Sequence, residues 1–277
     1  MHSFIDVQGV LLPLLSVTRT IQPVDLATWT LGTPIRLPAD DATVLFTPIT
    51  GLPATSWASP QAMAVMPGFA NTLLVSYANT QAGGVCVLDN GVPRALTVPL
   101  SSTSPMSWVQ FTPDGTQAYG LMGLNLYCLG VNGSGPSVSS ISPNQGYESS
   151  PILANGMLYF PYGEIVNPTG WSLLQGQPTP DSSNSGGSCS VCPDVEDQVV
   201  YYSNVSSILS FAMANNEPLG AFALEYSASP LLYFGRLLRY GTSSLLFQCQ
   251  DFFPWGTPDW TLSQRQEVFL LQTTDLK

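Results

Sequence analysis

The feature of the sequence that most limits its fold is a repeated pattern. The stretch GVCVLDNG, residues 84 to 91, returns as LYCLGVNG, residues 126 to 133, with a cysteine, an asparagine and a glycine in the same three places. The two cysteines, Cys86 and Cys128, are 128 − 86 = 42 residues apart. A fixed interval of this size is typical of repeat architectures, in which each repeat is one supersecondary unit.

Similar segments recur along the chain at intervals of about 40 to 45 residues. They begin near Pro60, Pro105, Ser150, Ser188 and Pro230. Each starts with a short apolar run and continues through a turn into a second run rich in Val, Leu, Tyr and Phe. Most contain a third run: GVCVLDNG, LYCLGVNG, WSLLQGQP and ILSFAMANNEP. Short strands separated by turn residues predict an all-β fold. Asn-Gly and Asp-Gly pairs, which favour hairpins, stand at 90–91, 114–115, 132–133 and 155–156.

A four-stranded unit of this length is the size of one propeller blade. We therefore predict a single β-propeller domain over residues 1 to 277, with six blades. Five blades come from the repeats, and residues 7 to 40 supply the later strands of the sixth. Its missing strand is expected from residues 266 to 276, so that N- and C-terminal strands close the ring and remove its exposed edges. Residues 41 to 59 are expected to be an insertion and residues 176 to 188 a flexible loop.

Two segments resemble a known repeat. The run FTPDGTQAYGLMGLNLYCLGV, residues 111 to 131, resembles the YVTN-type propeller repeat, in which a Pro-Asp-Gly hairpin precedes a strand and a further strand carries a short apolar triplet. The segment PVDLATWTLGTPIRLP, residues 23 to 38, is similar to the third and fourth strands of that repeat, with Asp25 at the usual turn. The resemblance implies a propeller, a fold that serves binding, scaffolding and a few enzymatic roles.

The charge of the chain limits which partners and which location we expect for it. Only 9% of residues are charged, against roughly 25% in an average soluble domain. The net charge is −11 and Lys277 is the single lysine, so nucleic acid is not an expected ligand. Asp6 precedes the apolar N-terminal stretch and Pro13 interrupts it, so we expect neither a signal peptide nor membrane insertion. A neutral surface suits extracellular proteins and packed assemblies, and we expect a virion or extracellular location.

Catalytic groups are scarce. The only histidine is His2, in a terminus expected to be mobile, so we expect no enzyme, no cofactor and no metal. Cys86 and Cys128 are expected to pack at equivalent points of successive blades. For Cys189 and Cys192, in the run CSVC, structural packing, a disulfide, and metal or redox chemistry all stay open. The run DVED, residues 194 to 197, is expected to be a solvated turn, with calcium binding as the alternative.

One stretch of sequence is rich enough in aromatic residues to suggest a binding surface. The segment DFFPWGTPDW, residues 251 to 260, combines large aromatic side chains with prolines and a glycine. Aromatic residues on stiff loops are favoured at interfaces, although they can equally plug the ring or cover its base. The predicted interface residues are Phe252, Phe253, Trp255 and Trp260, together with Trp57 in the 41 to 59 insertion.

These observations favour a non-enzymatic propeller that acts as an interaction or structural module of an extracellular assembly. Its partners would be other protein subunits, and its most specific form would be a virion component such as a phage tail or capsid-decorating protein. The alternative is an exported bacterial propeller of YVTN type that binds a ligand or glycan, or works as a lactonase-like or quinoprotein-like enzyme. A carbohydrate-binding lectin is the third possibility.

Overall fold

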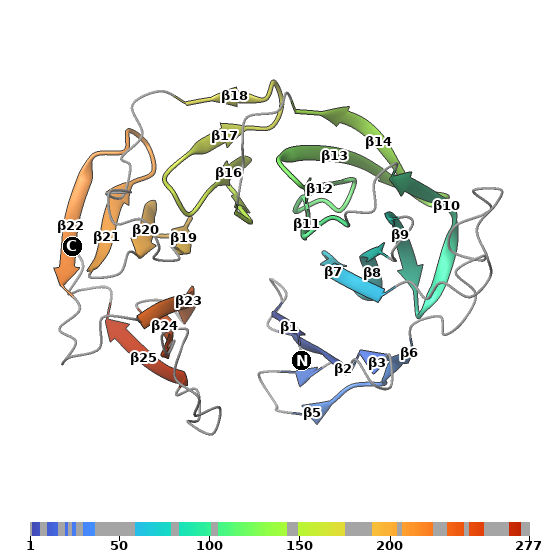
Figure 1. Ribbon diagram of the computed structural model, residues 1–277, viewed down its shortest axis with the longest axis horizontal. Helices are drawn as coiled ribbons and strands as arrows, with labels where there is room; N and C mark the ends of the chain where they lie inside the picture. The colour runs from blue at the N-terminus through green and yellow to red at the C-terminus, as the bar shows by residue number, and fades with distance from the viewer. Residues whose placement is uncertain are drawn as a thin grey trace, which may run out of the picture. The chain divides into compact units, whose positions relative to one another are not determined.

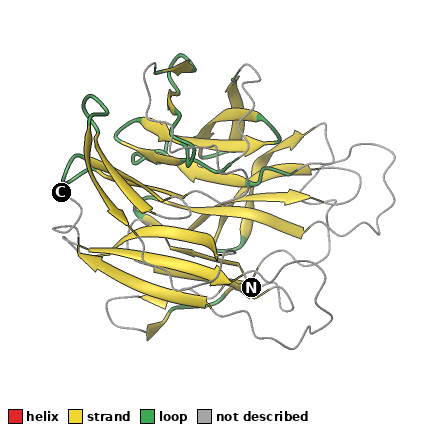
Figure 2. Ribbon diagram, turned by 60° about the vertical axis from the view of Figure 1, so that its left-hand side comes forward, coloured by secondary structure: helices red, strands yellow, loops and turns green. Residues whose placement is uncertain are grey.

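In the computed structural model the chain folds into two compact units, Met1–Glu148 and Ser149–Lys277. Every regular element in the described part of the chain is a β-strand (Figure 1, Figure 2), which confirms the all-β prediction. None of the described residues forms a helix long and apolar enough to cross a membrane. The described residues are 2–5, 10–15, 20–21, 24–25, 30–36, 59–78, 83–100, 105–142, 149–174, 190–203, 207–223, 232–240, 244–251 and 266–272.

The first sheet of unit 1 is a four-stranded antiparallel meander in which two strands are interrupted. One edge of β2 (Val10–Leu15) pairs with β1 (His2–Ile5), and its other edge pairs with both β3 (Thr20–Ile21) and β4 (Val24–Asp25). β6 (Ile35–Arg36) then pairs with β3, and β5 (Thr30–Leu31) pairs with β4. β3 and β4 therefore form the third strand in two pieces, and β5 and β6 form the fourth.

This sheet corrects two predictions. His2 does not lie in a free terminus, because it is part of β1 and its Cα partner is Leu14. β1 also supplies the first strand of the sheet, so the segment 2–36 provides all four strands and needs none from residues 266 to 276. The segment 23 to 38 does carry parts of the third and fourth strands, with Asp25 as the last described residue before their connection.

The second and third sheets of unit 1 are regular four-stranded meanders (Figure 1). The second contains β7 (Ser59–Met66), β8 (Phe69–Ala78), β9 (Gly83–Asp89) and β10 (Val92–Leu100). The third contains β11 (Trp108–Phe111), β12 (Gln117–Met122), β13 (Asn125–Asn132) and β14 (Gly135–Ile141). Cys86 lies in β9 and Cys128 in β13, each the third strand of its sheet, as the repeat predicted.

The core of unit 1 lies between these two sheets. Alternate residues of neighbouring strands point to one face, and those that meet here are apolar and buried, among them Leu74, Val87, Phe111 and Leu129. A buried serine links the sheets through the backbone, because the Met106 amide donates a 3.0 Å hydrogen bond to the Ser76 hydroxyl. Burial of a continuous apolar face on both sheets is the main force that holds them together.

Unit 2 continues the pattern. One sheet contains β15 (Ile152–Ala154), β16 (Met157–Tyr159), β17 (Ile165–Asn167) and β18 (Ser172–Leu173). The next contains β19 (Ser190–Asp194), β20 (Val199–Ser203), β21 (Ser207–Ala212) and β22 (Pro218–Ala223). The last contains β23 (Leu232–Tyr240), β24 (Ser244–Asp251) and β25 (Gln266–Gln272). Its apolar clusters combine side chains from successive sheets, for example Tyr201 with Phe247 and Tyr159 with Val200.

The predicted repeats coincide with the observed sheets, but two strands were placed wrongly. The run WSLLQGQP contains the fourth strand of its sheet, β18, because the shorter run Ile165–Asn167 is the third. Residues 266 to 272 form β25, the third strand of the last sheet, through pairs such as Leu245 with Leu271. Pairing with the preceding strand closes a shorter loop than pairing with the start of the chain would. Ring closure and the count of six blades remain predictions, as does a single domain over 1 to 277.

The predicted hairpins formed with different turn geometries. Asn90 and Gly91 have φ of 50° and 82°, and Asn155 and Gly156 have φ of 48° and 75°, so both pairs make the type I′ turn that Asn-Gly favours. Gly115 follows Asp114 with φ of 70° in the β11–β12 connection. The fourth pair differs, because Gly135 rather than Gly133 carries the positive φ, at 133°.

Candidate functional site

The aromatic surface predicted from sequence lies outside the described residues. This holds for Trp57, Phe252, Phe253, Trp255 and Trp260, and also for the predicted loop 176 to 188. The insertion 41 to 59 is outside as well, except for Ser59, which begins β7. The role of these aromatic residues therefore stays a prediction, and the candidate site comes from another part of the chain.

Four hairpins gather at one end of unit 1. In a meander alternate connections lie at the same end, which groups the β7–β8 and β9–β10 hairpins in one sheet and the β11–β12 and β13–β14 hairpins in the next. The two sheets touch at this end, since a Cβ built on Gly115 would lie 3.2 Å from Cγ of Met66. We call this surface, residues 67–72, 89–94, 112–116 and 132–135, the hairpin end.

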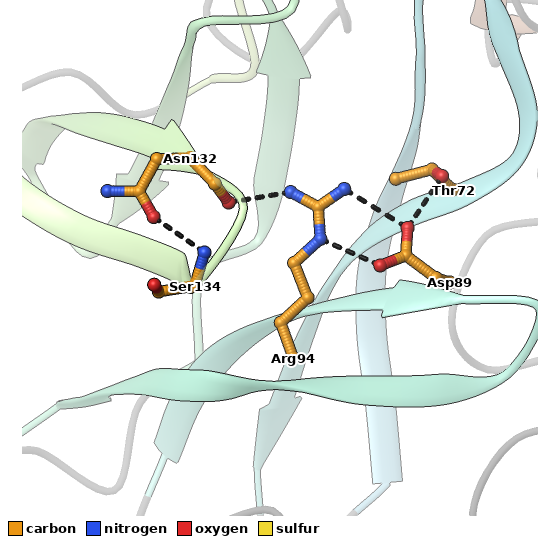
Figure 3. A network of polar contacts seen from close by, with 5 residues as sticks. All are labelled: Thr72, Asp89, Arg94, Asn132 and Ser134. Atoms are coloured by element: carbon orange, nitrogen blue, oxygen red, sulfur yellow. Dashed lines mark hydrogen bonds and ion pairs between the residues drawn. The ribbon is translucent and has the colours of Figure 1, made fainter.

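Arg94 joins the two sheets at the hairpin end (Figure 3). Its Nε donates to Oδ2 of Asp89 at 2.8 Å and its Nη2 donates to Oδ1 at 3.1 Å, a two-pronged contact within one sheet. Its Nη1 donates to the main-chain oxygen of Asn132 at 2.7 Å in the next sheet. The guanidinium fork suits this arrangement because its donors have fixed directions.

The partners of Arg94 are held by further hydrogen bonds. The Thr72 hydroxyl donates to Oδ1 of Asp89 at 2.8 Å, and the Ser134 amide donates to Oδ1 of Asn132 at 2.8 Å (Figure 3). The Leu96 amide adds a second bond between the sheets, to the Ser134 oxygen at 2.7 Å. We call Thr72, Asp89, Arg94, Asn132 and Ser134 the Arg94 network.

Hydrogen bonds fix the Asp89 side chain and favour its ionised form. Hydrogen bonding from Arg94, with a smaller contribution from Thr72, lowers the pKa of Asp89 against the opposing effect of burial. A carboxyl group with a lowered pKa beside an arginine is a poor general acid or base at neutral pH. The network therefore fixes the shape of the hairpin end and offers no proton for a reaction.

Asp114 organises the neighbouring Pro-Asp-Gly hairpin in a similar way. Its Oδ1 accepts from the Thr112 hydroxyl at 2.6 Å and from the Thr116 amide at 3.1 Å, and its Oδ2 accepts from the Thr116 hydroxyl at 2.8 Å. The Thr112 bond is the largest of the effects that lower the pKa of this exposed carboxyl group. The aspartate stabilises a turn that also needs Gly115 at positive φ.

Two large apolar side chains stand exposed on this stiff frame. Phe69, directly after the Pro67–Gly68 turn, is 62% exposed, and Val92, directly after the Asn90–Gly91 turn, is 66% exposed. Both belong to the sheet that Arg94 anchors. An exposed aromatic residue on a rigid hairpin can bind a partner with little loss of conformational freedom.

In unit 2 the DVED run binds an arginine. Asp194, whose side chain is fully buried, pairs with Arg239, and the exposed Glu196 accepts from Arg239 Nη2 at 3.0 Å. Oδ1 of Asp194 also accepts from the Asp197 amide at 3.0 Å, which shapes the turn. The guanidinium thus supplies the positive charge that the calcium alternative would have supplied. In the described part of the chain no three His, Cys, Asp or Glu side chains group as a metal site.

Three cysteines, Cys86, Cys128 and Cys192, are buried free thiols. Burial raises the pKa of Cys86 and of Cys192 to about 12, and it also raises the pKa of Cys128. Cys192 packs in the core with Tyr201 and Leu237, which supports structural packing over redox chemistry for this residue. Its sequence neighbour Cys189 lies outside the described residues.

Comparisons with known proteins show the fold of the chain and nothing further. No family model and no curated protein matches the sequence. A solved protein of unknown function from Bacteroides caccae superposes with a TM-score of 0.52 at 12% identity, covering 95% of this chain and 90% of that one. The WD40 domain of SCAP from fission yeast superposes with a TM-score of 0.52 at 11% identity, covering 98% of this chain and 74% of that one.

These likenesses show the kind of fold. WD40 domains are propellers built from four-stranded antiparallel blades, and four of the described sheets have this same pattern. The fold is therefore a β-propeller, as the repeat predicted.

Sequence reasoning missed the hairpin end. The Arg94 network joins residues 38 positions apart, and a single sequence carries no sign of such a pair. Phe69 could have been found, because it follows a proline and a glycine directly, and an aromatic residue beside such turn residues is a smaller version of the pattern that drew attention to residues 251 to 260.

Proposed function

We propose that this propeller is a non-catalytic interaction module that binds other protein subunits through its hairpin end. The observation that carries the proposal is the exposure of Phe69 and Val92 on a frame whose polar groups bind one another. Such a surface has apolar contact area to offer and few polar groups that a partner would have to desolvate.

The proposed setting is an extracellular assembly, and most specifically a virus particle in which the chain is a tail or capsid-decorating protein. Support comes from the 9% charged residues, which leave a largely neutral surface suited to close packing against neighbouring subunits. The lowered pKa of Asp89 and the raised pKa values of the buried thiols support binding over catalysis, because neither group is poised to react.

A second candidate is an exported bacterial propeller of YVTN type that binds a ligand or glycan or acts on a lactone. Two observations favour the repeat type: the hydrogen-bonded Pro-Asp-Gly hairpin at residues 113 to 115, and the parts of the third and fourth strands that lie within residues 23 to 38. A glycan ligand would quench tryptophan fluorescence on titration, which separates this candidate from a protein-binding module.

The test is to fractionate a lysate of the producing culture on a density gradient and to locate the chain by mass spectrometry. We expect it to travel with large particles at a fixed stoichiometry. If it stays with small soluble or envelope proteins, the virion setting is wrong.

Surface variants then test the hairpin end itself. Phe69→Asp combined with Val92→Asp should release the chain from the particles. Leu124→Asp is the matched control, because Leu124 is also exposed but lies in the β12–β13 hairpin at the opposite end of its sheet. Release by the control alone, or by neither variant, would show that the hairpin end is not the contact surface.

A further inference from the structure

The three Asn-Gly pairs of the chain share a chemical reactivity but not a structural setting. They are Asn90–Gly91, Asn132–Gly133 and Asn155–Gly156. Each lies in a hairpin: β9–β10, β13–β14 and β15–β16, respectively. In each pair the side-chain amide carbon of the asparagine lies near the main-chain nitrogen of the next residue. That residue is glycine, so no side chain shields its nitrogen.

We propose that Asn155 is a modification site, at which the asparagine converts spontaneously to aspartate or isoaspartate before either of the other two pairs reacts. The Gly156 nitrogen loses its proton to solvent base and forms a bond to Cγ of Asn155. Nδ2 takes up one proton from solvent, the bond from Cγ to Nδ2 breaks and ammonia leaves, so that the five-membered ring formed by the new bond is a succinimide. Water then opens the ring at either carbonyl carbon, giving aspartate or isoaspartate, with no change in oxidation state.

The turn must open before this ring can close. Asn155 and Gly156 hold a type I′ turn, with φ of 48° and 75°. In the succinimide ring Cβ of the asparagine and the glycine nitrogen are eclipsed about the Cα–C bond. The type I′ turn does not have this backbone torsion. The rate at each site therefore follows the population of its locally opened hairpin.

The Asn155 hairpin has the least to hold it closed. Its strands β15 and β16 have three residues each and pair through Ala154 with Met157 and two further residue pairs. The tip is exposed, and a Cβ built on Gly156 would meet no atom within 4 Å. Opening the tip of this hairpin breaks only the short pairing next to the turn, beginning with Ala154 and Met157.

The Asn132 hairpin is held by bonds that the reaction would have to break. Oδ1 of Asn132 accepts from the Ser134 amide at 2.8 Å, and its main-chain oxygen accepts from Arg94 at 2.7 Å. The Ser134 oxygen also accepts from the Leu96 amide at 2.7 Å. Both the attacked amide and the backbone around it are therefore fixed.

The Asn90 hairpin lies between these extremes. It has the same type I′ turn as Asn155, but it joins strands of seven and nine residues. The main-chain amide of Asn90 also donates to the main-chain oxygen of Asn71 at 2.9 Å, which connects the turn to the adjacent strand. The expected order of rates is Asn155, then Asn90, then Asn132.

The modification would change both charge and backbone. Either product adds one negative charge, which takes the formal net charge from −11 to −12. Isoaspartate also lengthens the main chain by one methylene inside a two-residue turn, which is incompatible with the observed pairing of Ala154 with Met157.

The test is to age the full-length native chain in mildly alkaline buffer and to follow each of the three peptides by mass spectrometry. We expect conversion at Asn155 to be roughly tenfold faster than at Asn132, the ratio that one or two additional hydrogen bonds would give. In the chain unfolded in urea all three sites should react at similar rates, because each asparagine precedes a glycine. Arg94→Ala should accelerate the reaction at Asn132 and leave Asn155 unchanged.

Two results would overturn the proposal. One is equal or faster conversion at Asn132 or Asn90 in the native chain. The other is persistence of the native order of rates in urea, which would mean that the adjacent sequence and not the fold decides the site.

Discussion

Arg94→Ala tests whether the Arg94 network holds two sheets of unit 1 together. The Arg94 side chain is only 15% exposed, and it binds Asp89 in its own sheet and the Asn132 oxygen in the next. The Asp89 carboxylate is 45% exposed, so solvent screening limits that ion pair to about 0.5–1 kcal/mol. The bond to the Asn132 oxygen adds about 1–1.5 kcal/mol. We expect a loss of about 2 kcal/mol in the free energy of unfolding.

Equilibrium unfolding in urea, followed by tryptophan fluorescence, measures this loss. Arg94→Lys is the matched variant: it keeps the charge but not the fork, and should lose about half as much. The lowered pKa of Asp89 means that its contribution is present above the pKa of the unfolded chain, near 4, and disappears as the pH falls through the lower folded value. The difference between wild type and Arg94→Ala should therefore shrink in acid. A difference below about 0.5 kcal/mol at neutral pH, or one that is unchanged in acid, would refute this account.

Four further predictions concern packing, a buried charge and, in two cases, the thiols. Gly135→Ala should destabilise the chain by roughly 3 kcal/mol, because the new Cβ would lie 2.3 Å from the Leu96 oxygen, whereas Gly133→Ala, with no atom within 4 Å, should be nearly neutral by urea unfolding. Arg239→Ala should lower stability by about 3 kcal/mol, since it strands the buried Asp194 charge, whereas Glu196→Ala, at a side chain 77% exposed, should change it by less than about 1 kcal/mol in the same assay. Because burial raises the pKa of the Cys86 and Cys192 thiols, their full contribution to stability is expected below the pKa of an unfolded thiol, about 8.5, and stability should fall as the pH rises above that value. Calorimetry at increasing pH measures this, and a constant transition temperature would contradict it. A thiol reagent should leave three cysteines untouched until the chain unfolds: Cys86, Cys128 and Cys192.

The strands that sequence placed well are those with strong local signals. The predicted repeat starts Pro105 and Ser188 lie three residues before β11 and two residues before β19, respectively. They could be placed because each repeat begins with an apolar run that ends at a turn. Turn residues with positive φ mark hairpins wherever the chain reverses within a few residues. Such information lies inside each repeat, so one sequence is enough to read it.

The first sheet was harder because its strands are short or broken. β1 has four residues, and the third and fourth strands are divided into pieces of two. Such pieces are too short to show the alternation that identifies a strand. Pairing between them is settled by the register of the whole sheet.

The candidate site was hidden for a different reason. Arg94 lies between two prolines of a strand pattern, in VPRALTVPL, and nothing adjacent to it indicates its partner in the next sheet. Arg239 likewise binds Glu196 from 43 residues away. Contacts between repeats depend on how sheets stack, and the sequence of one repeat does not specify that geometry.

The consecutive order of strands within each described sheet bears on how the protein is made. Strands that pair emerge from the ribosome one after another, so a sheet can form as soon as its last strand is free. β7 to β10 are complete when residue 100 has emerged, but at that point Arg94 and Leu96 still lack their acceptors at Asn132 and Ser134. During synthesis the outer strand β10 must therefore wait for the following repeat, and the bonds between these two sheets are the last to form.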